Sequence, residues 1–510
     1  MCSLQRIWTL KTQFDTSALL EAVSTIAQGA GSAEKLSDAE FFGGLYPVPS
    51  QTRSFEPDRI LVIGGRGTGK TQIFRALLDP PGRAAVVKAT GVKLVHDPAR
   101  ILFIESFTSG RSFVKNAPSH PSADAIESAL DAATAKDARK LWIGLSLARL
   151  AVDADAVKTL PSALRSRVDA LRKNASSPRD SLAWVSADVE RAFALIDDVD
   201  SAMTAKGQLC VFTFDALDRA ANDWATLEIA VGGLLSLALD ISRRCRSVRL
   251  KVFLRPDLEA SGMRSFPDAS KLRGYREELA WSTTDLYRMA FKRMGAAHEG
   301  GAETREYLEY LCGRSSFIDI APLGWTPTSA VDEDAQNRVM TALIGKYMGL
   351  NPRKGLTYTW IPNHLADALS RVSPRSFLVA FARAAGWMRD KGGSKGSTPL
   401  TPTSLAEGVK EASKQRVDEL AEDFPWIEEV ASQLEALEVP CSQARLLERL
   451  KKCRFVKGHA SLPGTDPYTV LEKLKDLGVF LESKDGRYNV PDLYRVAMGM
   501  KRRGGIKLAE

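Results

Sequence analysis

Short apolar runs alternate with longer stretches of helical periodicity through the first half of the chain. Four of these runs are expected to form buried strands, at 60–63, 101–104, 208–214 and 248–254. The stretches between them place apolar residues three and four positions apart, as amphipathic helices do. Strands that alternate with helices predict an α/β fold built on a parallel sheet.

Beyond these runs the chain is expected to be mainly helical. Residues from about 124 to 205 form a helical insertion, and the pattern is all helical again from about 280. The glycine- and serine-rich stretch 391–399 is typical of a linker. Three helical patterns then precede a hairpin around Asp485-Gly486, which predicts a winged-helix domain. The expected parts are an N-terminal extension (1–58), an α/β core (59–280, with the insertion at about 124–205), a helical lid (281–395) and a winged-helix domain (401–510).

Composition is that of a soluble globular protein. The chain has 510 residues, 44% hydrophobic and 26% charged. We expect no membrane span, because no apolar run reaches roughly 18 residues, and no secretory signal, because residues 1–6 lack an apolar core. Six cysteines and five histidines are scattered, so a structural zinc site and a disulfide framework are both disfavoured. A cytoplasmic location fits these features.

The net charge of +8 is concentrated near the C-terminus, where residues 441–510 hold fifteen Lys and Arg against eight Asp and Glu. A local basic excess favours contact with nucleic acid. A solvated basic tail has the same composition, so both interpretations stand. The candidate DNA-contacting residues are Lys451, Lys452, Arg454, Lys484, Arg487, Lys501, Arg502 and Arg503.

The segment 64–71 matches the phosphate-loop pattern G-x-x-x-x-G-K-S/T, and it lies between an expected strand and an expected helix. Glycines let backbone N–H groups converge on an anion, and the helix directs its positive end at the same phosphates. Lys70 would reach the β- and γ-phosphates, and the Thr71 hydroxyl would bind Mg²⁺. The alternative is a glycine-rich turn that matches by chance. The predicted nucleotide-binding residues are Gly64, Gly65, Arg66, Gly67, Thr68, Gly69, Lys70 and Thr71.

Two carboxylates follow the expected strand at 208–214. Asp215 would lie at the carboxyl end of that strand, where ligands bind in open α/β sheets, and would hold Mg²⁺. Asp218 is the candidate for polarising the attacking water. Arg255, at the end of the next strand, is placed to sense the γ-phosphate, or else simply pairs with Asp257.

A basic cluster, Arg243, Arg244 and Arg246, ends the helical pattern before the strand at 248–254. One of these residues is a candidate arginine finger that would act in trans on a neighbouring subunit. The alternative role is stabilisation of the helix end or simple solvation.

With these residues in place, the chain resembles the AAA+ and STAND division of P-loop ATPases over roughly residues 55–395, with a winged helix appended. The segment Asp215–Asp218 is similar to the D-x-x-D Walker B motif of STAND and KAP-like proteins, whereas AAA+ motors carry adjacent Asp and Glu. Ser373-Pro374-Arg375 resembles the Asn-Pro-Arg of the helical lid, which implies that Arg375 is a second sensor. The resemblance implies ATP as the nucleotide, a homo-oligomer and slow, switch-like hydrolysis.

Three functions follow from these features. The first is an ATP-dependent switch that oligomerises and controls a separate effector protein, in the setting of bacterial antiphage defence that the resemblance implies. The second is an ATP-regulated DNA-binding protein, similar to initiators or transposition regulators, which would use the winged helix. The third, a small-molecule or nucleotide kinase, is disfavoured by the large lid and the winged helix.

Overall fold

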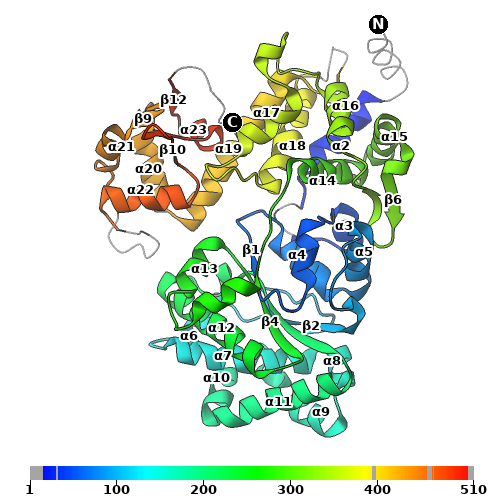
Figure 1. Ribbon diagram of the computed structural model, residues 1–510, viewed down its shortest axis with the longest axis vertical. Coiled ribbons are helices and arrows are strands. Elements are labelled where there is room, and N and C mark those ends of the chain that lie inside the picture. Colours follow the sequence, from blue (N-terminus) through cyan, green and yellow to red (C-terminus); the bar gives the residue numbers. More distant parts are fainter. Residues whose placement is uncertain are drawn as a thin grey trace.

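The computed structural model describes residues 15–29, 31, 33–392, 398–455, 462 and 464–503. Residues 1–14 of the expected N-terminal extension and 393–397 of the expected linker lie outside the described residues. Figure 1 shows an α/β core in the lower half, a helical part at the upper right and a smaller C-terminal domain at the upper left.

A five-stranded parallel sheet forms the centre of the core, in the order β2-β3-β4-β1-β5. The four expected strands are confirmed, and β5 is an additional strand whose polar sequence, Arg-Glu-Glu, has no apolar pattern that would predict it. Strand β4 lies between β1 and β3, so the carboxyl ends of these three strands meet at one edge of the sheet. The strands are β1 (Leu61–Ile63), β2 (Ile101–Phe107), β3 (Leu209–Phe214), β4 (Val248–Leu254) and β5 (Arg276–Glu278).

Alternate residues of the strands enter two hydrophobic clusters. Val62, Val211 and Phe253 belong to a cluster with α4, whereas Leu61 and Phe212 belong to another with α7 and α12. This alternation is the period-two pattern of a sheet that is covered on both faces. The helices before the insertion are α2 (Thr16–Thr25), α3 (Asp38–Gly44), α4 (Lys70–Leu78) and α5 (Pro80–Thr90).

The expected insertion is confirmed as helical, and part of it belongs to the core. Trp142 of α7 is fully buried between the rings of Phe107 and Phe214, and its indole donates to the carbonyl of Ala230 at 2.8 Å. Helix α7 therefore covers the sheet, and the remaining helices pack around it. The helices are α6 (Ala123–Ala129), α7 (Ala135–Val152), α8 (Ala154–Thr159), α9 (Ser162–Asp169), α10 (Pro178–Ala187) and α11 (Val189–Ala205).

Helix α12 (Trp224–Arg244) packs in the hydrophobic core beside the sheet. Among the described residues it is the one helix long and apolar enough, by length and composition, to cross a membrane, with a mean hydropathy of 1.5 in its most apolar window. Of that window, 61% is buried within the protein. Its partners include α7, β4 and the following helix α13 (Pro256–Gly262), as expected of a core helix.

The helical part after residue 280 contains a hairpin, so the expectation of an all-helical region is wrong there. Strands β6 (Phe317–Ile320) and β7 (Gly324–Pro327) pair antiparallel, and the rings of Phe317 and Trp325 stack with centroids 4.3 Å apart. This cross-strand aromatic pair stabilises two short strands whose sequence lacks a clear alternation. The helices are α14 (Thr283–Gly295), α15 (Gly301–Cys312), α16 (Glu333–Leu343), α17 (Thr357–Leu365) and α18 (Pro374–Asp390).

Helix α19 (Pro402–Asp423) packs closely against α18, although the expected boundary at 395–401 separates the two. A Cβ added at Gly408 would lie 2.1 Å from the Ala380 carbonyl oxygen, so the helices approach at a position that only glycine permits. Helix α19 thus joins the lid to the C-terminal domain.

The C-terminal domain combines short helices with a three-stranded antiparallel sheet of order β10-β11-β9. The predicted hairpin is confirmed, because β10 and β11 pair around a turn in which Gly486 has φ of +73°. The elements are α20 (Trp426–Leu434), β8 (Glu438–Val439), β9 (Cys441–Ser442), α21 (Gln443–Leu450), α22 (Pro467–Asp476), β10 (Leu481–Glu482), β11 (Arg487–Asn489), α23 (Asp492–Arg495) and β12 (Lys501–Arg502).

A fully buried lysine in the central strand β4 makes stability depend on pH. The Lys251 Nζ donates to the carbonyls of Glu56 (2.9 Å) and Arg59 (2.5 Å), and burial lowers its pKa to about 7. The unfolded chain therefore binds more protons than the folded chain between pH 7 and the ordinary lysine pKa. We expect the free energy of unfolding to rise with pH across that window, by up to about 1.4 kcal/mol per pH unit for this group.

Urea denaturation at several pH values measures this slope. Burial also lowers the pKa of Lys292, on α14, to about 7, so this lysine increases the slope of unfolding free energy against pH. The Lys251→Met variant should show a shallower slope than the wild type, and an unchanged slope would contradict this role for Lys251.

Candidate functional site

The glycine loop, residues 64–71, connects β1 to the N-terminus of α4. Gly67 and Gly69 have φ of +79° and +101°, which favour glycine. A Cβ at Gly67 would also lie 2.8 Å from the Ser373 hydroxyl, because the start of α18 packs on the loop. The Lys70 ammonium folds back to donate to the carbonyls of Gly64 (2.7 Å) and Gly65 (3.0 Å). The helix N-terminus and its lysine thus face the same space.

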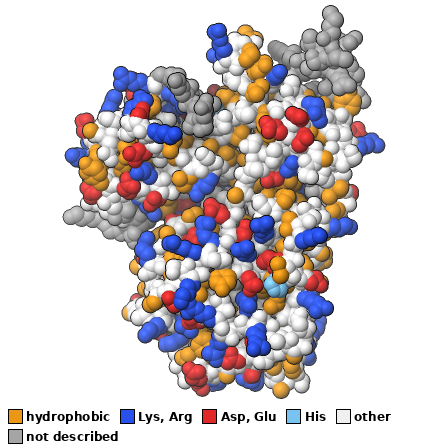
Figure 2. Space-filling model, in the orientation of Figure 1, with side chains coloured by type: hydrophobic (Ala, Val, Ile, Leu, Met, Phe, Trp, Pro, Cys, Tyr) orange, Lys and Arg blue, Asp and Glu red, His pale blue; other side chains and the backbone are white. Residues whose placement is uncertain are grey.

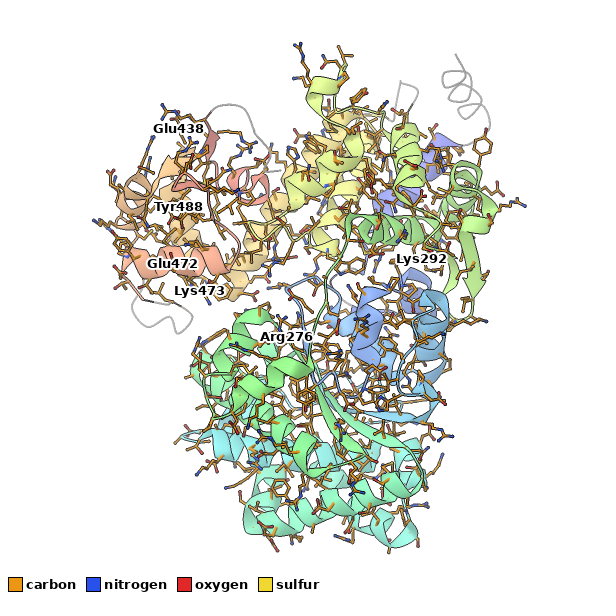
Figure 3. All side chains as sticks on the ribbon, viewed as in Figure 1. Arg276, Lys292, Glu438, Glu472, Lys473 and Tyr488 are labelled. Atoms are coloured by element: carbon orange, nitrogen blue, oxygen red, sulfur yellow. The ribbon has the colours of Figure 1, made fainter. Side chains whose placement is uncertain are left out.

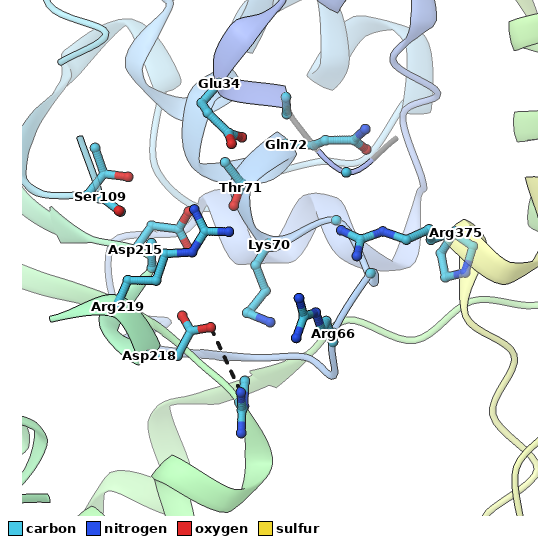
Figure 4. Close-up of a pocket in the computed structure, with 18 of the residues that line it drawn as sticks. Glu34, Arg66, Lys70, Thr71, Gln72, Ser109, Asp215, Asp218, Arg219 and Arg375 are labelled. Atoms are coloured by element: carbon cyan, nitrogen blue, oxygen red, sulfur yellow. Dashed lines mark ion pairs between the residues drawn. The ribbon is translucent and has the colours of Figure 1, made fainter. Parts of the chain in front are cut away.

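That space is a cavity of about 420 Å³ at the carboxyl end of the sheet, walled by the core, α18 and the end of α19. Figure 4 shows Lys70, Asp218 and Arg66 around it. Nine of the predicted site residues line it: Arg66, Gly67, Gly69, Lys70, Thr71, Asp215, Asp218, Arg255 and Arg375. These nine predicted residues therefore line one cavity, although they come from four separate segments of the chain.

Asp215 is the most deeply buried carboxylate of the cavity, with 1% of its surface exposed. Among the described residues, neither of its oxygens has a hydrogen-bond partner. Burial raises its pKa to about 6, against the opposing influence of the Thr71 hydroxyl and the Lys70 ammonium. A buried carboxylate that makes no hydrogen bond of ordinary geometry, although the Thr71 hydroxyl and the Ala216 N–H lie close enough to oppose the rise in its pKa, fits the first ligands of a hard cation such as Mg²⁺.

Asp218 reaches the cavity through a strained turn. Ala216 has φ of +53°, a left-handed conformation that is uncommon for a residue with a Cβ. The turn leads into a short 3-10 helix, Leu217–Arg219, which carries Asp218. The Asp218 side chain is 36% exposed, so it faces the open part of the cavity where a water molecule has access.

Arg255 is held by three carboxylates. It forms a double hydrogen bond with Asp257, at 3.0 and 2.7 Å, and its NH1 lies 2.6 Å from Asp423 and 3.9 Å from Asp218. Burial disfavours the charged guanidinium, but these neighbours hold its pKa above the ordinary value. The pairing with Asp257 that the sequence left open is therefore present, and Arg255 still lines the cavity.

The lid contributes Arg375 from α18. Its side chain lies against Gly67 and Gly31, and its NH1 pairs with Glu419 of α19 at 3.1 Å. Arg66 of the glycine loop reaches the same helix, where it pairs with Glu422 and, at 3.1 Å, with Asp423. The cationic side of the cavity thus meets the acidic end of α19.

Several lining residues have no signal in the sequence. The Trp281 indole follows the unpredicted strand β5 and donates to the Thr68 carbonyl at 2.9 Å. Arg219, which follows Asp218, and Glu34 of the N-terminal segment also line the cavity, and both are labelled in Figure 4. Arg293 of α14 donates to the carbonyls of Ile26 and Gln28, and burial lowers its pKa to about 10.

The basic cluster proposed to act in trans lies away from the cavity. Arg244 forms a double hydrogen bond with Asp197, at 2.7 and 2.6 Å, and Arg243 pairs with Asp268 at 3.3 Å. These residues end α12 just before β4 begins, at the edge of the sheet opposite the glycine loop. None of the three, Arg246 included, lines the cavity of its own chain.

No family model, curated protein or solved structure matches this chain. The chemistry of the cavity itself therefore supports the functional proposal. It offers backbone N–H groups at a helix N-terminus, cations on three sides and a buried anionic ligand for a metal. Such a site suits a polyphosphate with a bound divalent cation.

Proposed function

We propose that the cavity binds ATP with Mg²⁺ and hydrolyses it slowly, and that the chain is a switch ATPase of the AAA+ and STAND kind. One observation carries the proposal: the glycine loop, the unpartnered Asp215 and three arginines from separate segments line a single cavity. The volume of about 420 Å³ is in the range of ordinary small-molecule sites.

Each residue has a role in the proposed reaction. The glycine loop and the Lys70 ammonium bind the phosphates, which requires Lys70 to leave the carbonyls that it now contacts. Thr71 and Asp215 would hold Mg²⁺, which would supply positive charge to the bound phosphates. Asp218 orients the attacking water and accepts its proton. Arg255 and Arg375 stabilise the negative charge on the transferred group.

The proposed activity is a slow switch. Asp218 is three residues from Asp215 and sits on a partly exposed 3-10 turn, so its position depends on the strained residue Ala216. The closed lid and α19 connect the cavity to the C-terminal domain, which we interpret as a winged helix from its three helices and antiparallel hairpin. We further propose that the ATP-bound chain forms a homo-oligomer that controls a separate effector protein, in a setting of bacterial antiphage defence.

The alternative function, ATP-regulated DNA binding, rests on the basic excess of the C-terminal region. Several of its basic residues have acidic partners: Arg487 pairs with Asp485, Arg502 with Asp492 and Lys452 with Glu448. Figure 2 shows acidic side chains interspersed with lysine and arginine on this domain. This mixed surface supports DNA binding less than a continuous basic patch would.

Phosphate release from purified full-length protein tests the proposed activity. We expect Mg²⁺-dependent hydrolysis of ATP at roughly one turnover per second or less, at the low end of enzyme rates. The Asp215→Ala variant should lose this activity, while Lys88→Ala, an exposed change on α5, should keep it. Activity that survives in Asp215→Ala would contradict the assignment of the site.

A further inference from the structure

The last turn of α19 places carboxylates among the arginines of the cavity. Asp423 lies 2.6 Å from the Arg255 guanidinium and 3.1 Å from that of Arg66, and Glu422 also pairs with Arg66. One turn earlier, Glu419 pairs with Arg375 at 3.1 Å. The arginines come from the glycine loop, the end of β4 and the start of α18, and all three meet one helix end.

These arginines are the groups placed to bind the terminal phosphate. Arg66 and Arg255 each form an ion pair with the Asp423 carboxylate. A phosphate oxygen would bind the same guanidinium groups in its place. Burial raises the pKa of Asp423, with Arg255 and Arg66 opposing this effect and the nearby charges of Asp218 and Asp257 adding to it. A further anion at this point would add to the repulsion on Asp423.

Movement at Asp423 would reach the C-terminal domain directly. Asp423 is the last residue of α19, and the next residue, Phe424, has the Arg255 guanidinium 5.7 Å and the Lys473 ammonium 5.5 Å from its ring centre. Figure 3 shows Lys473 on α22, on the side of the domain that faces the core. Arg255 therefore contacts both the acidic helix end and the residue that leads into the domain.

We propose that Glu422 and Asp423, together called the acidic latch, compete within the molecule with the terminal phosphate of a nucleoside triphosphate for Arg66 and Arg255. When a triphosphate binds, the latch leaves the arginines, and the C-terminal domain is released from the core. A diphosphate lacks the competing group and leaves the latch in place. This inference rests on the proposed nucleotide site, and it adds the means by which that site distinguishes triphosphate from diphosphate.

Two neutralising variants test the latch, and a third acidic residue of α19 serves as the matched control. Asp423→Asn removes the negative charge that pairs with Arg255 and Arg66. Glu422→Gln removes the second negative charge of the latch, with little risk to folding because the Glu422 side chain is 62% exposed. Asp418→Asn alters an exposed carboxylate on the same helix. Affinities for a non-hydrolysable ATP analogue and for ADP are measured in full-length protein through Trp281 fluorescence, with Trp281→Phe to identify the signal.

We expect Asp423→Asn to bind the ATP analogue about tenfold more tightly than the wild type, equivalent to about 1.4 kcal/mol. Glu422→Gln should change the affinity in the same direction by a smaller factor, because its ion pair is largely exposed. Affinity for ADP should change less than about twofold, and Asp418→Asn should match the wild type. Equal changes for both nucleotides, or no change for either, would overturn the latch while leaving the nucleotide site intact. If the wild type bound neither nucleotide, the proposed function and the latch would fail together.

Small-angle X-ray scattering provides a second readout that does not depend on affinity. Measured on the monomer separated by size-exclusion chromatography, so that oligomerisation does not contribute, the radius of gyration of the wild type should increase with the ATP analogue, whereas it should not with ADP. Asp423→Asn should show the larger radius with less of the analogue. An identical scattering profile with and without the analogue, at saturation, would overturn the release of the domain.

Discussion

Lys70→Ala is expected to lower the affinity for Mg²⁺-ATP by at least about 100-fold, equivalent to about 2.7 kcal/mol. Among the described residues, the Lys70 ammonium donates hydrogen bonds to the carbonyls of its own loop, so it is available to bind the β- and γ-phosphates. Desolvation lowers its pKa from the ordinary value, with Asp218 and Asp215 opposing the shift, so a bound polyphosphate would further favour the charged form.

Isothermal titration of Mg²⁺-ATP into wild-type and variant protein measures this loss. Lys88→Ala is the control, since Lys88 is exposed on α5 and does not line the cavity. Thermal denaturation without nucleotide should give similar melting temperatures for all three proteins, which would exclude misfolding as the cause. Retained affinity in a folded Lys70→Ala protein would refute the phosphate-binding role of the loop.

Asp218→Asn is expected to reduce the rate of ATP hydrolysis by about 100-fold or more, the usual effect of removing a general base. Nucleotide binding should remain within about twofold, because Asp218 is partly exposed and lies 3.9 Å from Arg255, its one ion-pair partner among the described residues. The substitution keeps the size of the side chain, so the turn at Ala216 is preserved.

Single-turnover hydrolysis, with protein in excess over ATP, separates this effect from product release. The variant should accumulate as an ATP complex that the wild type converts to ADP. If the single-turnover rate were unchanged, the group that activates water would be a different residue, and Glu34, another carboxylate that lines the cavity, would be the alternative.

The strands that position the site were predictable because they are buried on both faces and therefore read as short apolar runs. Strand β5 could not be predicted in this way, because it is an edge strand with the polar sequence Arg276 to Glu278. The hairpin β6–β7 was also missed. This hairpin depends on the stacking of Phe317 on Trp325. The hydrophobic periodicity of two short strands does not predict such a contact.

The residues of the candidate site also fall into those that a local sequence pattern predicts and those that depend on tertiary packing. The glycine loop, Asp215 and Asp218 could be predicted because the proposed chemistry imposes a local spacing along the chain, and they line one cavity. Asp423 was missed because its contacts with Arg66 and Arg255 depend on how α19 packs against the lid, which no local pattern encodes. The close approach at Gly408, where α19 meets α18, is a tertiary feature of the same kind.

The central claim is that the cavity at the carboxyl end of the sheet is a Mg²⁺-ATP site. Equilibrium titration of ATP into purified full-length protein, with Mg²⁺ and then with excess chelator, tests it most directly. We predict saturable binding of one ATP per chain that weakens by at least about tenfold when Mg²⁺ is removed, because Asp215 and Thr71 then lack their cation. The absence of saturable binding up to about millimolar ATP, the weak end of specific affinity, would contradict the claim.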